Sequence, residues 1–391
     1  MSIPDKEYQS RMTKVQNILE EKEIDLAIVY FDEYNNMNGR YLTGWTPFFD
    51  KSAVIIPRGK DPVLVGGPES EDFARDAYIK NYRNVDAFKI PEEEYPSSKI
   101  ITFKELFSEF IEVSRIKKVG IVGGSIITHM IYSEMMKNLD SSTEVTDITA
   151  EFERLRAIKS GWEIEMSKKA YSIVNEAFLA FKDALVDGNT ELMAAGAAEG
   201  KARALGADSF GYSTITGSGE ERAGLYVSRA NEKKLVSGEF VMNGISPRYN
   251  GYTSTICCSL AVDGKYDELQ KRYFNDALEG LFYTRDNLKV GMNGKEINSI
   301  PKNFFIKKGY EKNVTSAFVH SNGLSEYEIP YFGPNNEKDV IQNGMILCLD
   351  MGLFHLEKHG GIRIETAYHV NNDKLEPMSK RAEDIFRSII K

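Results

Sequence analysis

One histidine and two carboxylates occupy positions where the sequence predicts strand ends or a charged strand face. An imidazole such as that of His320, with a pKa of about 6.5, is the side chain best suited to move a proton at neutral pH. Asp350 ends an apolar run, and a carboxylate at the end of a buried strand must find a partner or stay protonated. Alternation along the strand that contains Glu365 puts Arg363 on the same face. These residues predict a site for acid and base chemistry, in which Arg363, His320 or a metal ion is the partner of Asp350.

Two neighbouring segments offer further reactive groups. Glu326 and Glu328 alternate on one side of their segment, and Cys257 shares a strand face with Thr255. A thiol there could act as a nucleophile if His320 lowered its pKa, whereas a buried cysteine is usually a small apolar filler. Both interpretations of Cys257 stay open at this stage.

The elements that position these residues fall into two regions of the chain with different patterns of secondary structure. The chain has 391 residues, 42% of them apolar, which is enough for two packed domains. Residues 1–147 alternate between helical and extended patterns, which favours a layered α/β domain. Long helices follow at 162–185 and 191–204, and extended segments take over at 238–242, 252–260, 314–319, 345–351 and 362–370. We therefore expect an α/β domain over residues 1–155 and an α+β domain over residues 156–391.

Charge and cysteine content exclude several classes of partner. Lys and Arg number 49 against 58 Asp and Glu, a net charge of −9, and no basic stripe for nucleic acid or anionic lipid stands out. No apolar run approaches the roughly 20 residues that cross a bilayer. Three cysteines cannot build a disulfide framework, and residues 1–5 open no export signal, so we expect a cytoplasmic protein.

Five segments, taken in order, resemble the creatinase and aminopeptidase P family, which includes the Xaa-Pro dipeptidases. The resemblance covers nearly the whole chain and rests on residues 155–170, 238–252, 320–330 (HSNGLSEYEIP), 344–350 (GMILCLD) and 360–365 (GGIRIE). It implies a creatinase-like amino-terminal α/β domain followed by a catalytic α+β domain with the pita-bread fold. It also implies a homodimer.

The family's peptidases hold two metal ions with two aspartates, one histidine and two glutamates, and this sequence departs from that set. The first of these positions falls at Asn243 or Gly244 and the second at Thr255, and the other three are occupied by His320, Asp350 and Glu365. Two lost carboxylates leave a dinuclear cluster under-ligated. We therefore expect no metal cofactor; the alternative is a single Mn, Co, Zn or Fe ion held by His320, Asp350 and Glu365.

The leading hypothesis is a creatinase-like hydrolase that cleaves a carbon–nitrogen bond in a small polar substrate by general acid and base chemistry. Residues expected to take part in catalysis are His320, Asp350, Glu365 and Glu328. Residues expected to bind substrate are Arg363, Tyr252, Thr255, Cys257, Tyr327 and Asn243, with Tyr327 in the position of a family histidine. The alternatives are an Xaa-Pro dipeptidase or aminopeptidase that uses one ion, and a non-catalytic binding protein on the same scaffold.

Overall fold

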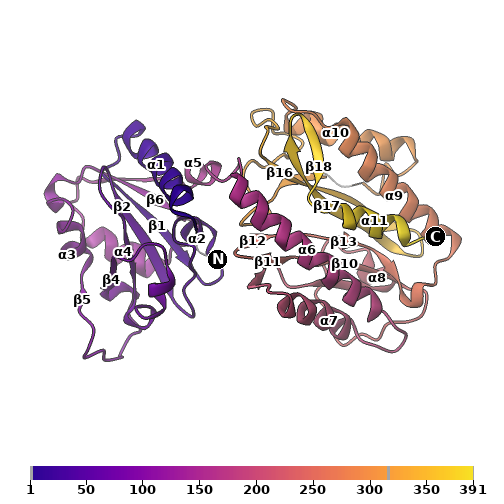
Figure 1. Cartoon of the computed structure of the whole chain (residues 1–391), viewed down its shortest axis with the longest axis horizontal. Coiled ribbons are helices and arrows are strands. Elements are labelled where there is room, and N and C mark those ends of the chain that lie inside the picture. The colour runs from indigo at the N-terminus through magenta and orange to yellow at the C-terminus, as the bar shows by residue number, and fades with distance from the viewer. Residues whose placement is uncertain (1–2, 315–317, 391) are drawn as a thin grey trace. The chain divides into compact units, whose positions relative to one another are not determined.

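The computed structural model describes residues 3–314 and 318–390 of the chain, which forms two units, Met1–Arg156 and Ala157–Lys391 (Figure 1). Each unit has its own sheets and core. Among the described residues, no helix is both long enough and apolar enough to span a bilayer.

The first unit is built on one seven-stranded sheet with the order β5-β4-β3-β2-β1-β6-β7. Its inner strand β1, between β2 and β6, is buried over six of its seven positions, so both faces of the sheet are covered, as the layered prediction requires. Apolar side chains of helices α3 and α4 join the core on one of these faces. The strands are β1 (Leu26–Asp32), β2 (Lys51–Pro57), β3 (Val63–Gly66), β4 (Tyr82–Val85), β5 (Ile100–Ile101), β6 (Lys118–Val122) and β7 (Glu144–Asp147). The α-helices are α1 (Asp5–Glu21), α2 (Met37–Thr43), α3 (Phe103–Ser108), α4 (His129–Lys137) and α5 (Thr149–Arg154). Four 3₁₀ helices are η1 (Pro68–Ser70), η2 (Phe73–Asp76), η3 (Asp86–Phe88) and η4 (Val113–Arg115).

The second unit contains three small sheets and six α-helices (Figure 1). The helices are α6 (Gly161–Asp183), α7 (Glu191–Ala204), α8 (Gly219–Ala223), α9 (Glu268–Asn287), α10 (Gly294–Lys307) and α11 (Lys380–Ser388), with a 3₁₀ helix η5 (Val262–Gly264). One sheet has the order β14-β10-β9 and another β12-β11-β8, and the largest has the order β13-β17-β16-β15, with β18 also paired to β17. The strands before residue 262 are β8 (Ser209–Phe210), β9 (Ile215–Ser218), β10 (Phe240–Gly244), β11 (Pro247–Tyr249), β12 (Tyr252–Thr253), β13 (Cys257–Cys258) and β14 (Leu260–Ala261). The later strands are β15 (Val319–Ser321), β16 (Ile346–Leu356), β17 (Gly360–Asn371) and β18 (Lys374–Pro377).

The long helices begin where the sequence supplies capping residues. Ser160 and Glu163 form a capping box at the start of α6, and Asp267 and Gln270 form another at the start of α9. Apolar residues of α6 and α9 share one hydrophobic core with residues of β16.

Two predicted strands differ from the structure. The segment 252–260 is divided among β12, β13 and β14, which pair with β11, β17 and β10 respectively. The division arises because Ser254 hydrogen-bonds to Pro247 and Thr253 to Gly323, so the backbone passes from one sheet to another. Of the strand predicted at 314–319, residues 315–317 lie outside the described residues, and β15 begins at Val319.

Candidate metal centre

The largest sheet of the second unit gathers the candidate side chains on one face. In its register His320 lies opposite Cys348, and Asp350 lies opposite Glu365. Cys257 lies opposite Glu365 from the other neighbouring strand. Because directly opposed residues project to the same side of a sheet, these five side chains share one face.

His320 lies at the centre of this cluster and is 4% exposed. Its Nδ1 atom is 3.2 Å from the Ser321 carbonyl oxygen, which turns Nε2 toward two carboxylates. Nε2 is 3.1 Å from Oε1 of Glu365 and 3.4 Å from Oε1 of Glu326. Burial lowers the pKa of His320, but the nearby charges of Glu326 and Glu365 outweigh it and raise the pKa to about 9.

Glu365 is fully buried and remains ionised. Its Oε2 atom accepts a hydrogen bond from the Cys257 thiol at 3.0 Å and lies 3.2 Å from the Arg363 guanidinium. Burial raises the pKa of Glu365, but the Arg363 charge and the hydrogen bond with His320 lower it to about 2. Cys257 therefore serves as a donor to Glu365, and burial raises the pKa of its thiol, which argues against the nucleophile interpretation.

Asp350 and Arg363 form a two-point ion pair with each other. Arg363 donates from Nε to Oδ1 at 2.8 Å and from its terminal nitrogen to Oδ2 at 2.6 Å. This geometry uses both oxygens of Asp350 and the paired donors of the guanidinium. Of the three partners expected for Asp350, the structure therefore has Arg363, and Asp350 is not in the group of side chains that gathers around His320. The role expected for Arg363 in binding a substrate carboxylate stays a prediction.

Two residues expected to bind substrate have partners away from the cluster, and a third lies at it. Asn243 donates to the Cys258 carbonyl at 2.6 Å and accepts from the Cys258 backbone at 3.3 Å, so its amide holds strand β13. Tyr252 donates its hydroxyl to Glu163 of α6 at 2.8 Å. Thr255 does lie at the cluster, with its Oγ1 3.5 Å from Oε1 of Glu326.

The loop after β15 separates its two glutamates. Glu328 is 2% exposed, pairs with Lys159 Nζ at 3.2 Å and accepts from the Ser325 backbone at 3.0 Å, so it lies apart from the cluster. Glu326 enters the cluster instead, with a side chain that is 19% exposed. Tyr327 is half-exposed, and its ring centre lies 5.0 Å from that of His320. Glu326, rather than Glu328, therefore lies beside His320.

Four side chains form a group that could hold a metal ion: His320, Glu326, Cys348 and Glu365, whose donor atoms all lie within 4.8 Å of one another. Glu326 and Cys348 were not among the predicted site residues. The alternation of Glu326 with Glu328 was visible in the sequence, and Cys348 lies two residues before Asp350 on the same strand face.

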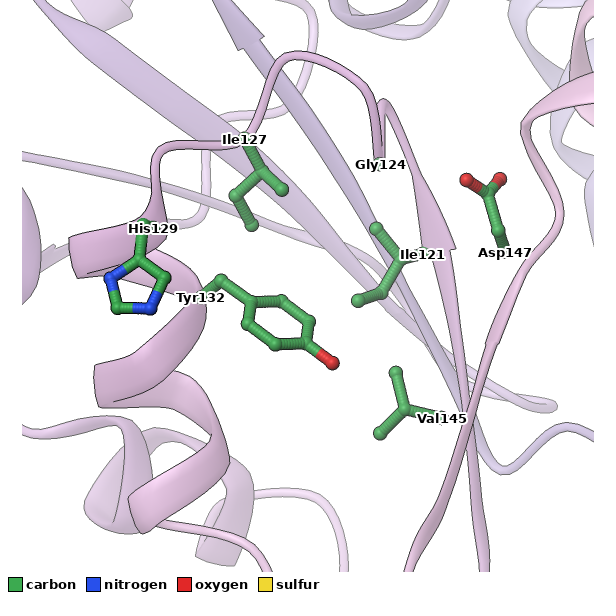
Figure 2. A pocket seen from close by; sticks show the side chains of 7 residues that line it. All are labelled: Ile121, Gly124, Ile127, His129, Tyr132, Val145 and Asp147. Carbon is green, nitrogen blue, oxygen red and sulfur yellow. The ribbon is translucent and has the colours of Figure 1, made fainter.

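A separate cavity of about 480 Å³ lies in the first unit, next to β6, β7 and α4. Figure 2 shows His129 and Asp147 at opposite ends of it, with Ile121, Ile127 and Tyr132 between them. The cavity brings together no set of three metal-ligating side chains in the described part of the chain. We therefore place the candidate site in the second unit.

Family models match both units. The model of metallopeptidase family M24 matches residues 165–372, and that of the creatinase/prolidase N-terminal domain matches residues 11–158. The chain belongs to metallopeptidase family M24. This result confirms the resemblance and the fold class, an α/β amino-terminal domain followed by a pita-bread domain, and assigns the chain to hydrolases of carbon–nitrogen bonds.

Similar proteins span almost the whole chain. An Xaa-Pro dipeptidase of Pyrococcus furiosus is 24% identical over 383 residues, covering 96% of this chain and 99% of that protein. An Xaa-Pro dipeptidase of Pyrococcus horikoshii is 26% identical over 349 residues, covering 86% and 96%. The solved prolidase of P. horikoshii OT3 is 23% identical with a TM-score of 0.80, covering 95% of this chain and 98% of that one.

The expectation of a site without a metal cofactor is wrong. The family is one of metallopeptidases, two relatives are named Xaa-Pro dipeptidases, and the described residues include a group suited to an ion. The expectation counted only the family's own ligand positions, whereas Glu326 and Cys348 reach the site from other positions. These findings favour the hypothesis of a peptidase with one ion over the metal-free creatinase-like reaction.

The residues fit one ion and not two. Asn243 and Thr255 provide no carboxylate, and both oxygens of Asp350 are engaged by Arg363. Donors about 2.0–2.1 Å from a tetrahedral ion lie roughly 3.3 Å apart. The separations of His320 Nε2 from Glu365 and Glu326, 3.1 and 3.4 Å, are close to that value.

Proposed function

We propose that this chain is a dipeptidase of the Xaa-Pro type that hydrolyses the carbon–nitrogen bond of small dipeptides with a single divalent ion. The observation that carries the proposal is the convergence of Glu326 and Glu365 on Nε2 of a buried His320. The names and full-length coverage of the relatives support the choice of substrate.

His320 and Glu365 would hold the ion. A bound ion at this place supplies Lewis-acid polarisation of the scissile carbonyl group. Arg363 and the Cys257 thiol fix Oε2 of Glu365, so that its Oε1 stays directed at His320. These second contacts orient the ligand before substrate arrives.

Glu326 is suited to move the proton. Burial raises the pKa of Glu326 even though His320 opposes the shift, which brings the carboxylate closer to the range in which it both takes and returns a proton. Its partial exposure gives Oε1 access to water and substrate, unlike the fully buried Glu365. In this role Oε1 takes a proton from the attacking water and delivers it to the leaving nitrogen.

Tyr327 would contact the substrate beside the reacting bond. Its ring stacks on that of Tyr331 at 5.0 Å, and both rings are nearly half exposed. A flat aromatic surface next to His320 suits the apolar ring of a proline residue.

The test measures hydrolysis of Ala-Pro and Ala-Ala by protein as purified, after chelation, and after addition of single metal ions. We expect preferential cleavage of Ala-Pro, loss of activity on chelation, and recovery with one equivalent of ion. Glu326→Gln should lower kcat by more than ~100-fold while the ion stays bound, because Gln cannot accept a proton. Glu357→Gln, in the exposed turn between β16 and β17, is the matched control. Turnover that survives complete removal of metal, or an ion-loaded protein inactive on every Xaa-Pro dipeptide, would refute the proposal.

A further inference from the structure

Cys348 occupies a position from which its sulfur can reach the ion. It lies on β16, between the strand of His320 and the strand of Glu365, and is fully buried. Its Sγ lies within 4.8 Å of the donor atoms of His320, Glu326 and Glu365. On its other side the Tyr171 hydroxyl of α6 lies 3.7 Å from Sγ, where it can donate to a thiolate.

The four candidate donors are not equivalent. His320, Cys348 and Glu365 come from three neighbouring strands of one sheet and are almost completely buried. Glu326 comes from the loop after β15 and is partly exposed. The strands therefore provide three fixed donors, and the loop provides a carboxylate that faces water.

We propose that Cys348 is a thiolate ligand, so that His320, Cys348 and Glu365 hold one thiophilic ion of the zinc class and Glu326 remains free to act on the substrate. This inference rests on the proposed function, because it specifies the ion that the proposed reaction uses. Three protein ligands of nitrogen, sulfur and oxygen match the composition of catalytic zinc sites.

Charge and softness both favour such an ion. A neutral imidazole, a thiolate and a carboxylate together carry two negative charges, which a divalent cation neutralises. Binding releases the thiol proton to solvent together with the proton of a charged His320, and no group changes its oxidation state. Thiolate ligands select zinc and other soft ions, whereas manganese, magnesium and calcium prefer sites made of oxygen.

The chain offers a matched control for Cys348. Cys258 is also fully buried but lies opposite Ile364 of β17, on the other side of β13 from Cys257, which lies opposite Glu365. A Ser substitution there removes a buried thiol of the same unit without touching the cluster.

The experiment adds Co²⁺ to metal-free full-length protein and records its absorption spectrum. We expect a thiolate-to-cobalt charge-transfer band that saturates at one equivalent, persists in Cys258→Ser and Cys257→Ser, and disappears in Cys348→Ser. A titration followed by the visible cobalt bands should show that Cys348→Ser binds the ion more weakly than the wild type. The loss of affinity should exceed the ~10–100-fold typical of substituting a residue that contacts a ligand but not the ion. Zn²⁺ should displace the cobalt, and Mn²⁺ should not.

Wild-type protein saturated with cobalt but without the charge-transfer band would overturn the inference, and this measurement needs no variant to fold. A band that is lost in Cys257→Ser and kept in Cys348→Ser would overturn it as well. Hydrolysis of Ala-Pro by cobalt-loaded protein without the band would leave the proposed function standing while the thiolate ligand fails. A band in protein that cleaves no Xaa-Pro dipeptide would support the thiolate ligand and refute the proposed function.

Discussion

Replacing Lys159 with methionine should destabilise the second unit strongly, because it leaves a carboxylate buried without its cation. The side chains of Lys159 and Glu328 are each 1% exposed and lie 3.2 Å apart. Removing one partner of a buried pair costs about 3–5 kcal/mol. Glu328 keeps its hydrogen bond from Ser325, so we expect a loss near the lower end, about 3 kcal/mol in the free energy of unfolding.

The chain provides both the probe and the control for this measurement. Its two tryptophans are Trp45 in the first unit and Trp162 on α6 in the second. In a Trp45→Phe background, the fluorescence of Trp162 reports urea unfolding of the second unit alone. Lys271→Met tests an ion pair of 2.7 Å whose side chains are 41% and 91% exposed, and it should change stability by less than about 1 kcal/mol.

A double variant distinguishes the destabilisation caused by the buried charge from other destabilising effects of the Lys159 substitution. Lys159→Met combined with Glu328→Leu should recover most of the lost stability, because no unpaired charge then remains in the interior. A loss below about 1 kcal/mol in Lys159→Met, or a double variant less stable than the single one, would contradict the reasoning.

Three further predictions concern the metal centre and the start of strand β17. Burial lowers the pKa of His320 but neighbouring carboxylates raise it to about 9, so the imidazole must lose a proton before it binds an ion. Calorimetry from about pH 6 to about pH 9 should find affinity rising by at least ~tenfold per pH unit, and more steeply when the Cys348 thiol also loses its proton on binding. A flat profile would contradict that linkage. Arg363→Met should weaken ion binding by at least ~10-fold in the same assay, because Arg363 orients a ligand carboxylate, whereas the exposed Arg381→Met should not. Gly360→Ala should lower stability by more than ~1–2 kcal/mol in thermal unfolding, because the φ of Gly360 is +74° and a Cβ there would meet the Glu220 backbone oxygen at 2.0 Å. The control is Gly196→Ala, which adds a Cβ in open space on α7 and should not destabilise the protein.

The fold was predictable from the sequence because it depends on periodicity and on segments that keep their order. Alternating helical and extended patterns predicted the layered first unit, and the five family segments predicted the pita-bread domain. Alternation also put Arg363 and Glu365 on one strand face, where the structure has them 3.2 Å apart. The homodimer and the cytoplasmic location stay predictions.

The ligand set was harder to predict, because it depends on a loop. Alternation put Glu326 and Glu328 on one side, but that rule holds only along an extended strand. In the structure only a single bridge joins Ser321 to Glu328, and the loop between them directs Glu328 to Lys159 and Glu326 to His320. Which of the two glutamates reaches the histidine was decided by a buried lysine on a distant segment, and no local pattern contains that information.

The ion pair between Arg363 and Asp350 has a consequence for how the protein depends on its metal supply. In the proposed one-ion site, the positive charge beside Asp350 comes from a guanidinium that is covalently attached and cannot be diluted, chelated or outcompeted. Activation by metal should then follow a simple hyperbola with one equivalent at saturation.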